Sequence, residues 1–336
     1  MVLNGKGVAV VKKRYEAIDG LRALACIGIV AMHMKENLSF QLEGFLFDKF
    51  IPSLTNLVFL FMVISAFGMC CGYFDKMIDK RLDIVSFYKK RYQKILPFFA
   101  FLCIIDLAMN PSLESLYEVF ANLTLCFGLI PNAKISVIGV GWFLGVVFAF
   151  YLLFPFFCFL ISSKTRAWFA LAVSLVMNYI CNVYFGAGRT SIVYCFVFFM
   201  AGGIVYIYRD RIMQIRGIRW ISLAAVLVVT VLYYTYLHNI LIILLIDVFA
   251  LIYAMSIDGK TILNNAFVRT IGGISFEIYL CHMVLFRVFE KTKLLKVISN
   301  EYVSYVLTVL VVLISSSIFA VLFKKAMDVI EQKLKR

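Results

Sequence analysis

Residues 18–33 read IDGLRALACIGIVAMH, an apolar stretch that contains Arg22 and His33. Ionisable residues inside a membrane span are costly to keep there, so their default interpretation is functional. Eleven residues advance an α-helix by three turns plus about 20°, so these two side chains share a face about 16 Å apart along the axis. One helix face is therefore predicted to present a fixed cation and a titratable base.

The whole chain is more apolar than a soluble protein. Hydrophobic residues make up 63% of its 336 residues and charged residues 15%, and its mean hydropathy is +0.94. Soluble domains are roughly 45–50% apolar and 25% charged. Apolar blocks about 17 to 25 residues long recur, and a helix of that length crosses the hydrocarbon core of a bilayer. The composition predicts an all-α, polytopic membrane protein.

Ten of these blocks are predicted to be transmembrane helices, and they cover residues 17–36, 51–73, 95–110, 138–161, 167–185, 191–208, 220–236, 239–256, 271–289 and 302–323. Residues 115–131 are also apolar, but this stretch is short and is interrupted by Glu118 and Asn122. It could span the membrane or re-enter it.

The basic residues in the loops favour a stretch that does not span, because cytoplasmic loops are enriched in lysine and arginine. With ten spans and a cytoplasmic N-terminus, the inner segments hold 24 basic residues and the outer loops hold 7. We therefore predict one membrane domain over residues 1–336, with cytoplasmic tails at 1–16 and 326–336, in the plasma (inner) membrane. The net charge of +14 then reflects topology and contact with anionic membrane lipids, not a nucleic-acid partner.

The nine cysteines all fall within apolar segments. This placement is typical of small buried hydrophobic residues, and it favours neither a disulfide framework nor a metal cluster. No metal is expected.

A basic cluster precedes the third predicted span, where residues 87–98 read FYKKRYQKILPF. Arg91 and Lys94 are three residues apart, so on a helix they share a face and could hold one anionic group between them. A cytoplasmic anchor of the kind that ends many spans is the alternative.

The ninth predicted span contains residues 274–282, ISFEIYLCH. Seven residues separate Ser275 from His282, which returns them to nearly the same helix face. His282 could act chemically, or it could hydrogen-bond a neighbouring helix, which contributes about 0.6 to 2 kcal/mol. Glu277 lies well round the helix from His282, and we predict that it pairs with a cation on another helix.

These motifs together resemble integral-membrane acyltransferases of the acyltransferase-3 type, which O-acetylate bacterial surface and secreted carbohydrates. Residues 19–25, DGLRALA, followed by His33, are similar to that family's first span, where an arginine or lysine precedes a histidine by eleven positions. Residues 61–67, FMVISAF, resemble its second-span signature, with Ala66 in place of glycine. Arg91 and Lys94, before Pro97, stand where the family has two arginines.

The resemblance continues to about residue 325. Residues 141–144, GWFL, with Tyr151 and Pro155 downstream, resemble the family's tryptophan-containing fourth span, and residues 275–282 match its late Ser-x-x-x-Tyr-Leu-x-His pattern. The resemblance implies an acyl-CoA donor, with acetyl-CoA the common case, and a carbohydrate or lipid-linked glycan acceptor.

The roles of individual residues follow from this resemblance. Acyl transfer to a sugar hydroxyl requires removal of its proton, and a neutral histidine with a pKa near 6.5 suits that task. We expect His33 to be the general base and Arg22, Arg91 and Lys94 to hold the donor phosphates. His282 could orient the acceptor, polarise the acyl carbonyl or serve structurally. The candidates for substrate contacts are Trp142, Ser275 and Tyr279.

Two other classes of protein remain open at this stage. A transporter of lipid-linked sugar or small solutes could line its path with the same charges, although transporters commonly show paired repeats, which are not evident here. A non-catalytic membrane scaffold would not explain why the costly ionisable residues Arg22 and His33 lie within a membrane span.

Overall fold

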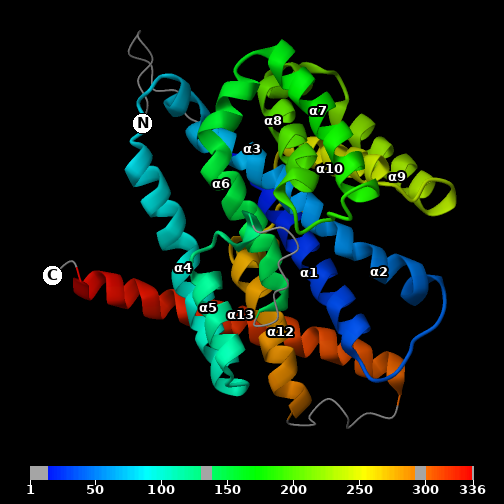
Figure 1. Cartoon of the computed structure of the whole chain (residues 1–336). Helices are drawn as coiled ribbons and strands as arrows, with labels where there is room; N and C mark the ends of the chain where they lie inside the picture. Colours follow the sequence, from blue (N-terminus) through cyan, green and yellow to red (C-terminus); the bar gives the residue numbers. More distant parts are fainter. Residues whose placement is uncertain (1–13, 130–137, 292–299, 335–336) are drawn as a thin grey trace.

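The computed structural model describes residues 14–129, 138–291 and 300–334, and every regular element in these ranges is a helix (Figure 1). The prediction of an all-α chain is confirmed. The longer helices are α1 (Ala17–Asn37), α3 (Leu57–Ile78), α4 (Ile84–Met109), α6 (Trp142–Ile161), α7 (Lys164–Val183), α8 (Ile192–Gln214), α9 (Ile218–Thr235), α10 (Ile240–Met255), α12 (Ser275–Lys291) and α13 (Glu301–Leu334). The shorter ones are η1 (Leu46–Phe50), α2 (Ile51–Ser53), η2 (Leu54–Asn56), α5 (Leu113–Leu123), η3 (Phe127–Leu129), η4 (Gly139–Gly141) and α11 (Ala266–Gly273).

Within the described ranges, eight helical segments are long and apolar enough to cross a membrane. A ninth candidate is the pair α11 and α12, which is bent by 69°. Helix α10 is apolar but has only 16 residues, fewer than the roughly 20 that cross a bilayer without thinning it. A multi-pass membrane protein is therefore confirmed, and the count of ten spans stays a prediction.

The described part of the ambiguous stretch 115–131 is not a long helix. Helix α5 has 11 residues and ends at Leu123, which is too short to span, and residues 130 and 131 lie outside the described ranges. These helix bounds favour the interpretation that residues 115–131 do not span the membrane.

Two helices extend beyond the predicted span boundaries at residues 95 and 323. Helix α4 begins at Ile84, where the Asp83 carboxylate accepts hydrogen bonds from the backbone N–H groups of Val85 and Ser86, each at 3.2 Å. These bonds and that of the Ser86 hydroxyl favour the ionised carboxylate, so the pKa of Asp83 lies below its usual value. Arg91 and Lys94 consequently lie inside this helix, and α13 continues well past Lys324.

Two glycines let α11 and its preceding loop pack directly against the start of α1. A Cβ atom on Gly272 would lie 1.9 Å from the carbonyl oxygen of Asp19, and one on Gly20 would lie 1.9 Å from the carbonyl oxygen of Leu263. Neither distance is possible for real atoms, so both contacts require glycine. This packing fixes the turn of α1 that carries Arg22 relative to the start of α12.

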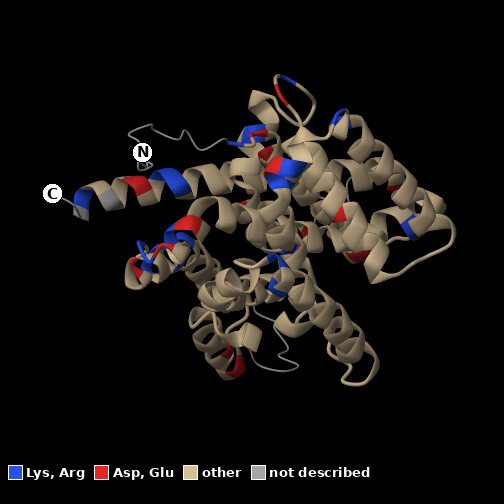
Figure 2. Cartoon of the chain, turned by 90° about the horizontal axis from the view of Figure 1, so that it is seen from above, with Lys and Arg blue, Asp and Glu red and all other residues tan. Residues whose placement is uncertain are grey.

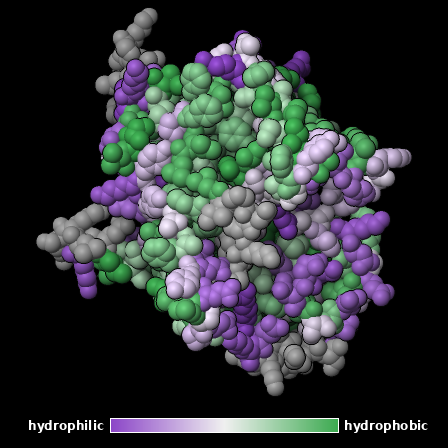
Figure 3. Space-filling view, viewed as in Figure 1, coloured by the Kyte–Doolittle hydropathy of each residue, from purple (hydrophilic) through white to green (hydrophobic). Residues whose placement is uncertain are grey.

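The surface of the bundle is suited to lipid. Hydrophobic side chains gather over the area where Figure 1 places α6, α7 and α8 (Figure 3). The exposed side chains of α6 and α7 include Phe156, Phe159, Phe169 and Val176. Charged residues are sparse along the helices (Figure 2). Such extensive exposed apolar area is not expected of a soluble monomer, whereas helices with satisfied backbones can present it to hydrocarbon.

Candidate functional site

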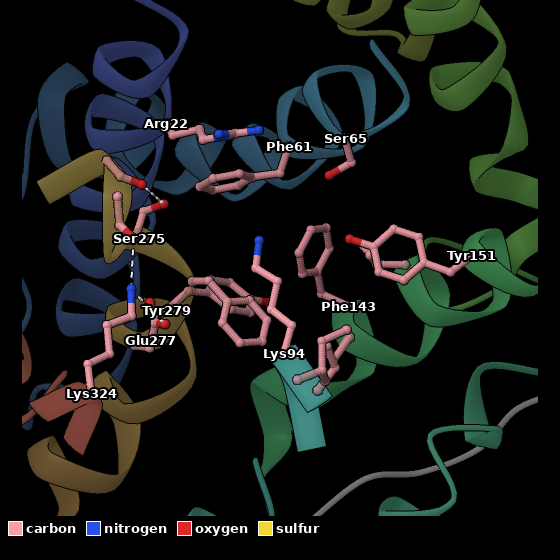
Figure 4. Close-up of a pocket in the computed structure, with 16 residues that line it drawn as sticks. Arg22, Phe61, Ser65, Lys94, Phe143, Tyr151, Ser275, Glu277, Tyr279 and Lys324 are labelled. Atoms are coloured by element: carbon pink, nitrogen blue, oxygen red, sulfur yellow. Dashed lines mark hydrogen bonds and ion pairs between the residues drawn. The ribbon is translucent and has the colours of Figure 1, made fainter. Parts of the chain in front are cut away.

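A cavity of about 180 Å³ lies where α1, α3, α4, α6 and α13 meet the junction of α11 and α12 (Figure 4). We call it the cationic cavity, and we call the end of the bundle where α1 begins the N-terminal end. Four of the predicted binding residues line this cavity, namely Arg22, Lys94, Ser275 and Tyr279. Phe61, Phe143 and Tyr151 form aromatic walls, and Ser65 adds a hydroxyl.

Three cations and one carboxylate line the cationic cavity. Lys324 pairs with Glu277 at 3.0 Å and donates to the carbonyl oxygen of Gly273 at 2.9 Å. Arg22 pairs with Asp19 at 3.1 Å. Lys94 points into the cavity (Figure 4) and forms no ion pair with any residue that the structure describes. The lining therefore keeps an excess of positive charge, which suits an anionic ligand.

The predicted partner of Glu277 is now identified. The sequence placed Glu277 on a face of its helix away from His282, and its cation is Lys324 of α13. Ser275 is the first residue of α12, and its hydroxyl donates to the carbonyl oxygen of Gly272 at 2.8 Å. The hydroxyl is thus held at the bend between α11 and α12.

Arg91 lies beside the cationic cavity and does not line it. Its guanidinium donates to the Tyr73 hydroxyl at 2.7 Å and lies 5.0 Å from the Tyr73 ring centroid and 5.7 Å from that of Tyr151. Tyr151 lines the cationic cavity. Tyr73 lines a second cavity at the same end, of about 340 Å³, to which Lys76, Arg81 and Lys90 also contribute. Arg91 therefore lies against one wall residue of each cavity, Tyr151 of the cationic cavity and Tyr73 of the second cavity.

His33 and His282 are brought together by the packing of α1 against α12. Their ring centroids are 5.2 Å apart. His282 is fully buried, and its Nδ1 lies 2.6 Å from the carbonyl oxygen of Tyr279. Since a carbonyl oxygen only accepts, Nδ1 carries the proton, and Nε2 is the basic nitrogen. No described residue hydrogen-bonds that buried Nε2, so it is available to accept a hydrogen bond at the pair.

Tyr279 connects the cationic cavity to the histidine pair. It lines the cavity, its hydroxyl donates to the carbonyl oxygen of Val140 at 2.9 Å, and its ring centroid lies 5.9 Å from that of His282. Phe143 packs against it at 5.2 Å. Arg22 and His33 are separated by about 16 Å along α1, and Tyr279 occupies the interval on the facing helix.

Trp142 is not part of the cationic cavity. The guanidinium of Arg189, from the loop between α7 and α8, lies 5.6 Å from the Trp142 ring centroid and donates to the Thr55 hydroxyl. Arg189 is also close enough to His33 for the two to interact electrostatically. The arrangement therefore places a cation close enough to act on His33 and outside the lining of the cationic cavity.

Two of these residues were missed by sequence reasoning. Lys324 follows the predicted last span directly, where a lysine is typical of a cytoplasmic anchor, and Arg189 lies in a predicted outer loop. No spacing or motif singles out either residue, because both gain their partners from helices that are distant in sequence.

Cysteines and metal ligands give no further site. All nine cysteines lie in the described ranges, none forms a disulfide, and seven are buried. Residues 14–129, 138–291 and 300–334 hold no group of three or more histidine, cysteine, aspartate or glutamate side chains that could bind a metal ion.

The described helices thus form a multi-pass membrane protein in which Tyr279 connects a cationic cavity to a pair of histidines. The acyltransferase-3 family model, described as an acyltransferase domain, matches residues 15–325. The chain belongs to this family of membrane O-acyltransferases. No curated protein matches the chain, and no solved structure does.

Proposed function

We propose that the protein transfers an acyl group, specifically acetyl, from acyl-CoA to a hydroxyl of a cell-surface or lipid-linked carbohydrate. The observation that supports this most is that one helix, α1, contributes Arg22 to a cationic cavity and His33 to a histidine pair. A thioester donor of this kind has an anionic end and a reactive end, and α1 offers a partner to each.

The donor binds from the N-terminal end of the bundle. Arg22 and Lys94 contact its phosphates in the cationic cavity, and Lys324 adds a third cation. Arg91 extends the positive charge toward the second cavity at that end, where the nucleotide lies. The pantetheine arm then runs past Tyr279 and carries the thioester to His33.

The chemistry is a direct acyl transfer. His33 removes the proton from the acceptor hydroxyl as its oxygen attacks the thioester carbonyl. The carbon–sulfur bond then breaks, and the coenzyme A thiolate takes the proton from the imidazolium. The products are an ester and free coenzyme A. The basic Nε2 of His282 has no partner among the described residues, and its role is to accept a hydrogen bond from the imidazolium that forms at His33 during the reaction.

The proposal includes an orientation in the membrane. The N-terminal end faces the cytoplasm, where acyl-CoA is made, and the residues 1–336 act as one domain in the plasma (inner) membrane. The excess of basic residues in the predicted inner segments supports this orientation. Ser275 and Tyr279 contact the donor side of the reaction, and Trp142 lies on the acceptor side.

The test is acyl transfer by purified protein in nanodiscs. Labelled acetyl-CoA is incubated with a panel of methyl glycosides, and both acetyl-sugar and free coenzyme A are measured. The proposal predicts equal amounts of the two products from the wild type. A protein that binds sugars, consumes no thioester and moves solute across vesicles would be a transporter, and that result contradicts the proposal.

A further inference from the structure

A larger cavity, of about 850 Å³, lies between α7, α8, α9, α10 and the start of α3. We call it the amide cavity. Four asparagines line it, together with three tyrosines and one histidine, and Arg189 is the single charged side chain among the described residues of its lining. Apart from Arg189 and His238, its polar side chains are amides and phenols, which are uncharged and can hydrogen-bond.

Hydrogen bonds hold three of the four asparagines in place, and these three keep unused hydrogen-bonding capacity. Asn178 is buried, and its amide donates to the carbonyl oxygen of Tyr194 at 2.8 Å. The Asn56 amide donates to the Tyr233 hydroxyl at 3.2 Å, and the Asn239 oxygen accepts from the Ile242 N–H at 3.1 Å. Each amide has two N–H donors and an oxygen with two lone pairs, so each can still bond a ligand.

This lining selects one class of ligand by its chemistry. A sugar presents hydroxyls that both donate and accept, as side-chain amides do, and it presents C–H groups on its ring faces. Tyr233 and His238, with ring centroids 5.2 Å apart, offer aromatic faces to those groups. A nucleotide or polyphosphate would need several cations, and the lining supplies one.

The amide cavity adjoins the reaction centre through Arg189. This residue lines the cavity, lies over Trp142 and interacts electrostatically with His33. Along α3, Phe59 lines the amide cavity, whereas Phe61 and Ser65 line the cationic cavity. A ligand in the amide cavity therefore approaches the histidine pair from a different side than a ligand in the cationic cavity.

We infer that the amide cavity binds the saccharide of the acceptor. The inference rests on the proposed function and adds the place where the acceptor is held. Apolar residues of α7 and α10, among them Leu175 and Leu241, continue the lining. A free saccharide and a lipid-linked one share the same hydroxyl chemistry, and only the second would also contact these apolar residues.

The experiment measures sugar binding and acyl transfer on the same nanodisc-embedded protein. The probes are methyl glycosides of glucose, galactose, mannose, rhamnose and N-acetylglucosamine, each compared with its dodecyl glycoside. Saturation-transfer NMR gives the dissociation constants. The variants are Asn56→Ala and Asn182→Ala, and Asn182 is an exposed residue whose loss does not disturb packing. The matched control is Asn110→Ala, an exposed asparagine at the end of α4 outside the cavity.

We expect at least one sugar to bind, and we expect Asn56→Ala and Asn182→Ala to weaken its binding about fivefold each, because each removes one neutral hydrogen bond. Acetyl-CoA binding and the Asn110→Ala control should not change. Tighter binding of the dodecyl form would assign the site to a lipid-linked saccharide, and equal binding would assign it to a free one.

The remaining outcomes separate this inference from the proposed function. Sugar acetylation with a Michaelis constant unaffected by both variants would overturn the inference and leave the function standing. Sugar binding that the variants weaken, without any thioester consumption, would support the inference and overturn the function. Absence of binding by every probe would overturn the inference.

Discussion

The cationic cavity and the amide cavity are lined by different chemistry. The first is about 180 Å³ and has three cations around Glu277, whereas the second is about 850 Å³ and has four asparagines with Arg189 as its charged residue. Charge recognises an anionic donor, and neutral amides recognise hydroxyls. Under the proposed function, the donor and the acceptor are separated by the chemistry of their sites as well as by position.

His33 is the base of the proposed reaction, at which donor and acceptor meet, so its loss should have the largest effect. We expect His33→Ala to lower the rate of acetyl transfer by about 10²- to 10⁴-fold, because the general base is removed. Donor and sugar binding should be retained. Transfer is measured with labelled acetyl-CoA, and the control is Lys35→Ala, whose side chain pairs with Glu36 on the same helix. Transfer that survives the substitution would remove His33 as the base.

The cations of the cationic cavity should determine donor affinity and leave sugar affinity unchanged. Arg22→Ala combined with Lys94→Ala is expected to raise the dissociation constant of acetyl-CoA roughly 100-fold, since a hydrogen bond to a charged group contributes about 1.5–3 kcal/mol. Binding is measured by equilibrium dialysis at fixed salt. The matched control is Arg216→Ala, in the loop between α8 and α9. An equal loss of sugar binding would contradict the assignment of the donor and the sugar to different cavities.

The packing of α11 on α1 should be sensitive to a single methyl group. Gly272→Ala is expected to destabilise the protein by about 2 kcal/mol, because its Cβ would meet the Asp19 carbonyl oxygen at 1.9 Å. Gly273→Ala is the control, since a Cβ there has no atom within 4 Å. Thermal unfolding in detergent compares the two variants. Equal unfolding temperatures would show that α11 does not pack on α1 in this way.

The Lys324–Glu277 pair should have the smallest effect of the four. Lys324→Met leaves a buried carboxylate without its partner and should destabilise the protein by about 1 kcal/mol, a figure reduced for solvent screening because the Lys324 side chain is 43% exposed. Adding Glu277→Gln should recover most of the loss. The pair of Lys35 and Glu36, whose carboxylate is 48% exposed, is the control, and Lys35→Met should change stability by less than about 0.5 kcal/mol. No recovery in the double variant would contradict the pairing.

The sequence predicted the features that depend on a single helix. The 3.6-residue period puts Arg22 and His33 on one face of α1, and it separates Glu277 from His282 on α12. The lengths of the apolar blocks predicted most of the spanning helices, because the bilayer imposes a minimum length. These properties are local, and the residues themselves encode them.

Features that depend on packing between helices were not predictable from the same patterns. The contact between His33 and His282 arises from the way α1 packs on α12. In the sequence, Lys324 resembles a cytoplasmic anchor and Arg189 resembles an ordinary loop charge. Only the folded structure brings Lys324 of α13 to Glu277 and Arg189 of the loop after α7 to Trp142. The 69° bend between α11 and α12 interrupts what reads as one span. No periodicity within one segment contains this information.

The separation of donor and acceptor can be tested directly in sealed vesicles that contain the protein in both orientations. Labelled acetyl-CoA, which does not cross the membrane, is placed either inside the vesicles or outside, and a membrane-impermeant polymer of the accepted sugar is always outside. The cationic cavity at one end and the amide cavity at the other predict acetylated polymer when the donor is inside and none when both reagents are outside. Product formed with both reagents outside, and none when they are separated, would contradict the account.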